Sequence, residues 1–263
     1  MAAACAATVS VPSQALHSWS VIAADTAHAP QKSPVLCLLG APHLLHGSNR
    51  FDLPFSAPGL LLVCLGMHGD WVPRERLMTL FWPDATEADA QHHLRVTLHR
   101  ARQWLHGPGL AGQLASERRR LQLAVACDVP QFRAAIGRAD WAAAVALHRA
   151  PLLDGAAPKS FAAVDEWLAL EREALTTAWR NAALRQAARL EAAADAAGAA
   201  TLLQALLRFD LLAEDVLQAL LRVAAAAGER STALDTFERF RERAADELGL
   251  DPLPGTLTLA QTL

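Results

Sequence analysis

The sequence predicts a mainly α-helical protein, in which an α+β part is followed by an all-α part. Three observations lead to this prediction. Residues 71–105 show two helical patterns separated by the turn Trp82-Pro83-Asp84, and the strand-forming segment ERRRLQLAV follows closely at residues 117–125. From Asp128 onward the pattern is helical throughout and rich in alanine, the residue with the highest helix propensity. The length of 263 residues is enough for two domains of ordinary size.

The first 33 residues are expected to form a mostly disordered leader. They lack the positively charged start that a secretory signal requires. We therefore divide the chain into this leader at residues 1–33, a first domain at 34–127 and a second domain at 128–263.

A small antiparallel sheet should open the first domain. Residues 35–40 are a compact apolar run that ends in glycine, which is typical of a buried strand. Residues 43–45 and 51–53 supply two further candidate strands, and Gly47-Ser48-Asn49 is suited to the turn between them.

Two helices should follow this sheet, each with a proline near its start. Residues 56–67 form the first, with Pro58 in its first turn, and residues 73–82 form the second, beginning at Pro73. Proline is tolerated there because the first N–H groups of a helix have no partner within it. Pro83 ends the second helix, since it disfavours the helical conformation in the residue before it.

The third helix, residues 86–105, is long and amphipathic. Thr86 is a suitable N-cap, and Glu87 and Asp89 favour the positive end of the helix dipole. Its apolar residues recur at helical spacing on one face, while the opposite side is polar and basic. The apolar face consists of Ala90, Leu94, Leu98, Ala101 and Leu105.

A β-hairpin is predicted after Gly107-Pro108-Gly109 ends this helix. Residues 110–114 and 121–125 form its strands, with Glu117 and the three arginines that follow it at the tip. A helix, a turn, a basic helix and a hairpin in this order make a winged helix-turn-helix, which places one helix in a DNA groove. A hairpin tip rich in arginine suits phosphates or a minor groove, although a solvated turn has the same composition.

The candidate DNA contacts come from the polar side of the long helix and from the hairpin tip. They are residue types that reach base edges and phosphates. The set is Gln91, His92, Arg95, Val96, His99, Arg102, Gln103, Arg118, Arg119 and Arg120.

The second domain should consist of helices alone. Their predicted ranges are 128–138, 140–150, 161–197, 199–208, 213–227, 229–248 and 255–262. Alanine recurs at close-packing positions, as in the antiparallel helix pairs of tetratricopeptide (TPR) repeats. No strict 34-residue period is visible, so the pattern fits degenerate TPR-like repeats and also a plain α-bundle.

The net charge of −3 is unevenly distributed. Residues 1–127 contain ten basic and eight acidic residues, whereas residues 128–263 contain 14 and 19. Residues 86–125 contain six arginines and four histidines but only three acidic residues. A basic module joined to an acidic one indicates a DNA-facing part and a protein-facing part, although ordinary solvated surface would explain the charges equally well.

Enzymatic and metal chemistry find no support in the sequence. The four cysteines are widely separated, which argues against disulfides and zinc and fits reduced thiols in the cytoplasm. His92, His93, His99 and His106 have no carboxylate or thiol partner at a known ligand spacing. Motifs for nucleotide binding or hydrolysis are absent, and no apolar run is long enough to span a membrane. We therefore predict neither an enzyme nor a cofactor.

The first domain resembles the winged helix of SARP/AfsR-type bacterial regulators, which is related to the DNA-binding domain of OmpR-like response regulators. The resemblance rests on residues 73–77 (PRERL), on 80–84 (LFWPD), and on Leu94-Arg95 with Leu98. The sequence departs from the family at Phe81, where leucine is usual, and in the histidines of the long helix.

The second domain resembles the bacterial transcriptional activation domain (BTAD), a TPR-like helical module. The matching segments are Cys127-Asp128-Val129 with Phe132, residues 151–155 (PLLDG), Trp167-Leu168 with Glu171-Arg172, and residues 246–256 (DELGLDPLPGT). Together the two resemblances cover residues 34–263.

The resemblance implies a cytoplasmic transcriptional activator that binds double-stranded DNA. It further implies binding to promoter direct repeats as a homodimer or as side-by-side protomers, with contact to RNA polymerase. The alternative is an adaptor that binds proteins through its helical domain without specific DNA binding. The net charge and the histidines of the long helix favour the adaptor, whereas the arginines of that helix and of the hairpin oppose it.

Overall fold

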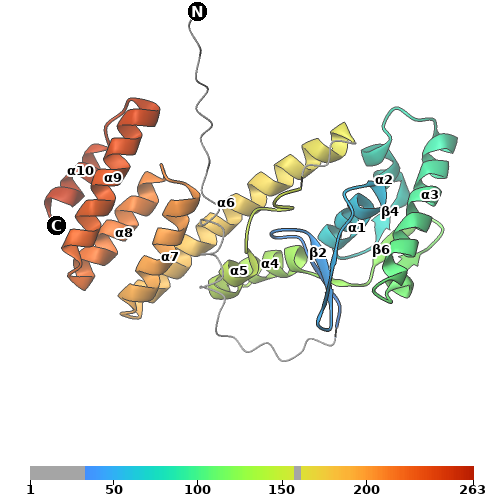
Figure 1. The fold of residues 1–263 in the computed structure, drawn as a ribbon, viewed down its shortest axis with the longest axis horizontal. Coiled ribbons are helices and arrows are strands. Elements are labelled where there is room, and N and C mark those ends of the chain that lie inside the picture. Colours follow the sequence, from blue (N-terminus) through green and yellow to red (C-terminus); the bar gives the residue numbers. More distant parts are fainter. Residues whose placement is uncertain (1–32, 157–160) are drawn as a thin grey trace, which may run out of the picture.

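The computed structural model describes residues 33–156 and 161–263. It is mainly helical, with small sheets in the N-terminal part, and this confirms the predicted fold class (Figure 1). Apart from Ser33, the predicted leader lies outside the described residues.

The first sheet has four strands in the order β3-β2-β1-β7. These are β1 (Val35–Cys37), β2 (His43–His46), β3 (Asn49–Asp52) and β7 (Ala126–Cys127). The antiparallel pairing of β1, β2 and β3 follows the sequence prediction. The parallel pairing of β1 with β7 was not predicted, because a strand of two residues is too short to show an alternating pattern.

Helix α1 (Ala57–His68) is buried on all sides from Gly59 to Met67. Its two glycines allow close packing. A Cβ at Gly66 would lie 2.4 Å from Leu36 Cδ2, and one at Gly59 would lie 1.8 Å from the carbonyl oxygen of Pro54. Helix α1 can therefore sit at the centre of the N-terminal part only because these two positions lack side chains.

Helix α2 (Arg74–Phe81), helix α3 (Glu87–His106) and a second sheet complete the N-terminal part. The sheet contains β4 (Val72–Pro73), β5 (Leu114–Ser116) and β6 (Arg120–Leu123), in the order β4-β6-β5. A 3-10 turn at Ala111–Gln113 replaces the start of the first predicted hairpin strand. Because α1 packs against both α3 and β6, the buried helix supports the long helix and the hairpin together.

The C-terminal part contains helices α4 to α10, and from α4 to α9 each helix packs against the next one along the chain. Their bounds are α4 (Asp128–Gly137), α5 (Trp141–Leu147), α6 (Ala162–Ala192), α7 (Ala196–Phe209), α8 (Glu214–Ala227), α9 (Arg230–Leu248) and α10 (Pro254–Gln261). Helix α6 is long enough to contact both α2 and α7 (Figure 1).

Helix α6 ends five residues before its predicted end at residue 197. Ala194 has a left-handed backbone with φ of 61°. The Asp195 carboxylate then accepts a hydrogen bond from the Gly198 N–H at 2.9 Å, which caps α7. The alanines on both sides favour helix equally, so periodicity alone did not reveal this break.

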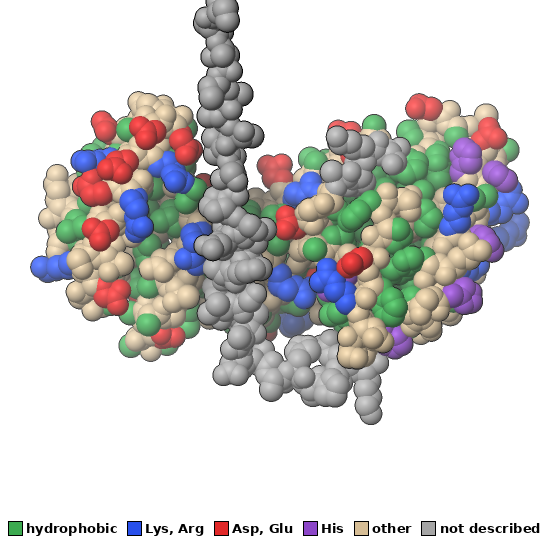
Figure 2. Space-filling model, viewed as in Figure 1, with side chains coloured by type: hydrophobic (Ala, Val, Ile, Leu, Met, Phe, Trp, Pro, Cys, Tyr) green, Lys and Arg blue, Asp and Glu red, His purple; other side chains and the backbone are tan. Residues whose placement is uncertain are grey.

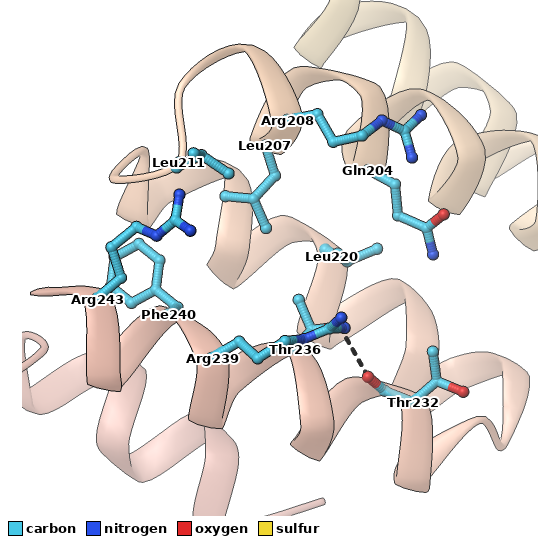
Figure 3. Close-up of a pocket in the computed structure, with 10 residues that line it drawn as sticks. All are labelled: Gln204, Leu207, Arg208, Leu211, Leu220, Thr232, Thr236, Arg239, Phe240 and Arg243. Atoms are coloured by element: carbon cyan, nitrogen blue, oxygen red, sulfur yellow. Dashed lines mark hydrogen bonds between the residues drawn. The ribbon is translucent and has the colours of Figure 1, made fainter. Parts of the chain in front are cut away.

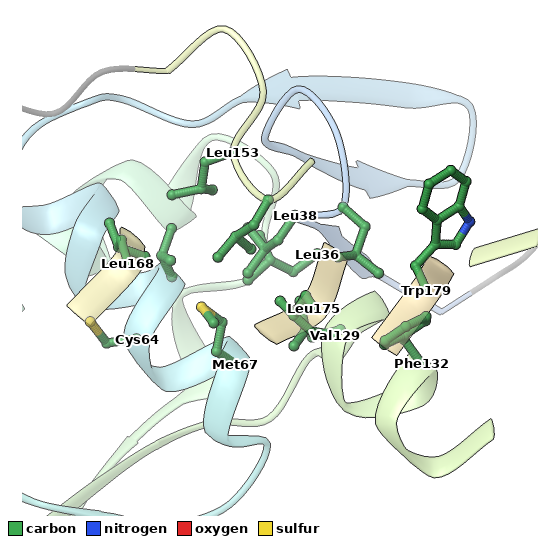
Figure 4. Packing of buried hydrophobic residues seen from close by; sticks show 14 of the residues in the cluster. Leu36, Leu38, Cys64, Met67, Val129, Phe132, Leu153, Leu168, Leu175 and Trp179 are labelled. Carbon is green, nitrogen blue, oxygen red and sulfur yellow. The ribbon is translucent and has the colours of Figure 1, made fainter. Parts of the chain in front are cut away.

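A continuous apolar core joins the N-terminal and C-terminal parts. Figure 4 shows Leu36 and Leu38 of the first sheet region beside Met67 of α1 and Phe132 of α4, with Leu175 of α6 close by. The domain boundary at residues 127 and 128 stays a prediction, because the described residues on its two sides share this core.

Asp128 links the two parts through polar contacts. Its side chain is 2% exposed. The carboxylate accepts hydrogen bonds from the N–H groups of Leu38 at 2.9 Å and Leu39 at 3.0 Å, and from Arg149 at 3.0 Å. Burial raises the pKa of the Asp128 carboxyl, while these donors oppose the rise. The predicted strand at 35–40 stops at Cys37, and the next two N–H groups bond to Asp128 rather than to a neighbouring strand.

None of the helices in the described ranges is both long and apolar enough to cross a lipid bilayer.

Candidate nucleic-acid interface

Helix α3 forms and is oriented as its sequence predicts. The Thr86 hydroxyl accepts a hydrogen bond from the Asp89 N–H at 3.2 Å and donates to the Asp89 carboxylate at 2.7 Å. The five predicted core residues of this helix are buried, together with Thr97. The polar side of the helix is therefore turned outward.

The seven candidate residues of α3 differ in exposure. Gln91, His92, Arg95, His99 and Gln103 are exposed, whereas Val96 and Arg102 are half-buried. Figure 2 shows histidine and basic side chains gathered at the end of the molecule occupied by α3, whereas acidic and basic side chains are interspersed at the opposite end. The histidines and arginines expected from the sequence to face DNA thus lie together at one end of the molecule.

Arg102 faces the hairpin. Its guanidinium donates to the carbonyl oxygen of Leu114 at 3.4 Å, a long contact that joins α3 to β5. The Nε of Arg95 donates to the Gln91 carbonyl, one turn earlier in the same helix, at 3.3 Å. Arg95 is exposed, so it is better placed than Arg102 to meet an external partner.

The hairpin, or wing, consists of β5 and β6 with Glu117, Arg118 and Arg119 at its turn. Arg118 and Arg119 are exposed there. Arg120 begins β6 instead, where its Nε donates to the Glu117 carboxylate at 2.7 Å and its guanidinium lies 4.6 Å from the centre of the Trp71 ring. The three consecutive arginines are therefore not equivalent, and Arg120 has partners within the protein.

A groove of about 270 Å³ brings the wing and the first half of α3 together. Gln91, Arg95, Arg118 and Arg119 all line it. The other lining residues are Arg74, Glu75, Met78, Glu87 and Leu94. Glu87 accepts a hydrogen bond from the Gln91 amide at 3.1 Å, which joins these two side chains on α3.

Arg74 is a groove residue that the sequence analysis missed. Its Nε donates to the Glu117 carbonyl at 3.1 Å, its terminal nitrogen to the Ser116 hydroxyl at 2.7 Å, and its backbone N–H to the Arg119 carbonyl at 2.9 Å. Burial and the nearby Arg102 lower the pKa of Arg74. The sequence signal was weak, because Arg74 follows the two-residue strand β4 and contacts a hairpin more than 40 residues away.

The histidines of α3 do not form a metal site in the part of the chain that the structure describes. There, no group of three or more histidine, cysteine or acidic side chains has an arrangement that could hold a metal ion. The His93 ring instead lies 5.5 Å from the Trp82 ring, and His92 lies 6.1 Å from His93. His93 therefore packs against the turn between α2 and α3.

Comparison with known proteins adds two findings. Residues 130–263 match the family model described as "Bacterial transcriptional activator domain", which covers just over half of the chain. The fold is similar to that of Mycobacterium tuberculosis EmbR, whose structure was solved in complex with a low affinity phosphopeptide. The TM-score is 0.57 and the identity 21%, over 87% of this chain and 64% of the EmbR chain. No curated protein matches the sequence.

Proposed function

Since the chain belongs to the bacterial transcriptional activator domain family of transcriptional regulators, we propose that it binds promoter DNA through α3 and the wing. The observation that carries the proposal is the groove in which Gln91 and Arg95 of α3 lie beside Arg118 and Arg119 of the wing. The family is one of transcriptional regulators rather than of enzymes, which agrees with the resemblance to SARP-type proteins.

The proposed complex has α3 in the major groove, which is wide enough to admit one helix. Arg95 and Gln91 would read base edges, because arginine pairs bidentately with guanine and glutamine with adenine. His92, Val96, His99 and Gln103 would lie along the same groove. Arg118 and Arg119 would contact phosphates, which position the protein without reading sequence. Arg102 and Arg120 have contacts within the protein, and we therefore propose that both stabilise the wing rather than bind DNA.

The C-terminal helices are proposed to contact RNA polymerase and a second protomer on neighbouring direct repeats, in the bacterial cytoplasm. This part of the proposal rests on the family resemblance and on the acidic character of residues 128–263. An acidic surface repels DNA, so we expect these helices to bind proteins rather than DNA.

The decisive experiment is fluorescence anisotropy of the purified full chain with duplexes from its own upstream region and from those of neighbouring genes. Two salt concentrations and scrambled duplex as competitor separate specific binding from non-specific binding. We expect sequence-selective binding that weakens as salt increases. Binding no stronger than to scrambled duplex at low salt would contradict the proposal and favour the adaptor.

Replacing Arg95 tests the role of α3 directly. We expect Arg95→Ala to lower the affinity for the specific duplex by about 1–3 kcal/mol, because a base contact is lost. The control is Arg222→Ala, which removes an exposed arginine from the outer side of α8. An unchanged preference for the specific duplex in Arg95→Ala would remove this residue from the interface.

A further inference from the structure

A second groove lies in the C-terminal part, far from α3 along the chain. Helix α8 packs against both α7 and α9, and the groove opens above α8 between the other two helices. Its volume is about 400 Å³, within the range of pockets that hold small molecules. Gln204, Leu207 and Arg208 come from α7, Leu220 from α8, and Arg239, Phe240 and Arg243 from α9 (Figure 3).

The floor of this groove is apolar. Leu220 is 3% exposed and Phe240 5% exposed, and Leu207 points from α7 toward them (Figure 3). Leu211, between α7 and α8, lines the same groove and is 45% exposed. A ligand that covers this exposed leucine would remove apolar surface from water, and this favours binding.

The rim of the groove is basic. Arg243 forms an ion pair with Glu247 at 3.8 Å, whereas among the described residues no carboxylate lies within ion-pair distance of Arg208 or Arg239. Arg239 is held along α9 by hydrogen bonds to the Asp235 carbonyl at 3.1 Å and the Thr236 hydroxyl at 3.4 Å. Arg208 and Arg239 therefore leave positive charge at the rim without an ion-pair partner in the described residues, and this charge would attract a bound anion.

The rim also differs in charge from the C-terminal part as a whole. Residues 128–263 contain 14 basic and 19 acidic residues, yet the charged side chains that line this groove are all arginines. Gln204 and the guanidinium of Arg239 lie away from Leu211 and Phe240, whereas the guanidinium of Arg243 lies beside these two apolar side chains (Figure 3). The lining therefore combines apolar surface with arginines, and an occupant that matches it has an anionic head and an apolar body.

We propose that this groove binds a small amphipathic anion, a carboxylate, sulfonate or phosphate attached to an apolar body. Its head would pair with Arg208 and Arg239, and its body would cover Leu207, Leu211 and Phe240. This inference does not depend on DNA binding, because α3 and the wing contribute no residue to the groove.

The test uses 8-anilinonaphthalene-1-sulfonate (ANS), a fluorescent probe that has an aromatic body and one anionic group. We expect saturable binding to the full chain. The double variant Arg208→Gln, Arg239→Gln should bind ANS at least about tenfold more weakly, since charge-assisted hydrogen bonds are lost. The control Arg138→Gln, Arg222→Gln removes the same charge from exposed positions outside the groove.

The uncharged analogue N-phenyl-1-naphthylamine should bind the original chain more weakly than ANS does.

Circular dichroism of each variant verifies that the fold is retained, which these exposed substitutions should allow. Equal ANS affinity in the two double variants would overturn the proposal, and so would the absence of saturable binding by the original chain. If an acidic peptide binds through the same arginines while ANS does not, the groove is a peptide site and the small-molecule proposal is wrong.

Discussion

At the scale of single residues, His148 stands out because it is buried among aromatic rings. It is 4% exposed, and its ring stacks on Trp179 with 4.8 Å between ring centres. Neither ring nitrogen forms a hydrogen bond with another residue in the described part of the chain. Burial lowers the pKa of His148 to about 4, because the charged ring would lose its hydration.

This shift predicts a loss of stability in acid. The unfolded chain takes up a proton at His148 near its ordinary pKa of about 6.5, whereas the folded chain takes it up only near 4. The free energy of unfolding should therefore fall as the pH drops from about 6.5 to about 4, by roughly 3 kcal/mol from this group. His148→Phe should reduce that fall, as measured by urea unfolding at a series of pH values. An equal pH dependence in the variant would show that His148 does not cause it.

Asp128 is the second residue whose environment makes a specific prediction. Asp128→Ala would leave the buried N–H groups of Leu38 and Leu39 without their acceptor. We expect a loss of about 2–4 kcal/mol in the free energy of unfolding, because unsatisfied buried donors are costly. Asp246→Ala, at an exposed position in α9, is the control. Equal urea midpoints for the two variants would contradict this assignment.

At the scale of elements, the wing is placed by contacts from three sides. Strand β4 pairs with β6, Arg74 of α2 bonds to Glu117 and Ser116, and Arg102 of α3 bonds to Leu114. A hairpin alone is only marginally stable in water. These contacts therefore fix the turn that carries Arg118 and Arg119 relative to α3.

The wing arginines should contribute affinity without sequence preference. We expect Arg118→Gln, Arg119→Gln to weaken binding to all duplexes and to reduce the slope of log affinity against log salt by about 1–2. Anisotropy titrations over a range of salt concentrations measure this slope, with Arg222→Gln as the control. A slope equal to that of the original chain would remove the wing from the DNA interface.

At the scale of the whole molecule, the two parts share one apolar core. Strand β7 precedes α4 directly, pairs with β1, and is followed by Asp128, which bonds back to residues 90 positions earlier. Helix α4 packs against α1, and α6 packs against α2. Contacts of this kind make the N-terminal part depend on the C-terminal helices for stability.

A fragment of residues 33–127 should therefore be much less stable than the full chain. It loses Asp128 as an acceptor and exposes the apolar surfaces that Phe132 and Leu175 cover. Thermal unfolding followed by circular dichroism measures the difference, and the full chain should unfold in a single transition. A fragment that melts at the same temperature as the full chain would show that the N-terminal part is an independent domain.

The sequence by itself determined the order of the helices, the buried face of α3, the hairpin after it and the similarity to one family of regulators. These features are encoded locally, because helical spacing, N-caps and turn residues act over a few neighbouring positions. Only the tertiary structure decided that Arg120 turns to Glu117 and Trp71 while Arg118 and Arg119 stay exposed, and that Arg74 joins the groove. It also brought Arg208 and Arg239 to one groove from two helices. Such contacts join residues far apart in the chain, and they depend on how whole elements pack, which no local pattern specifies.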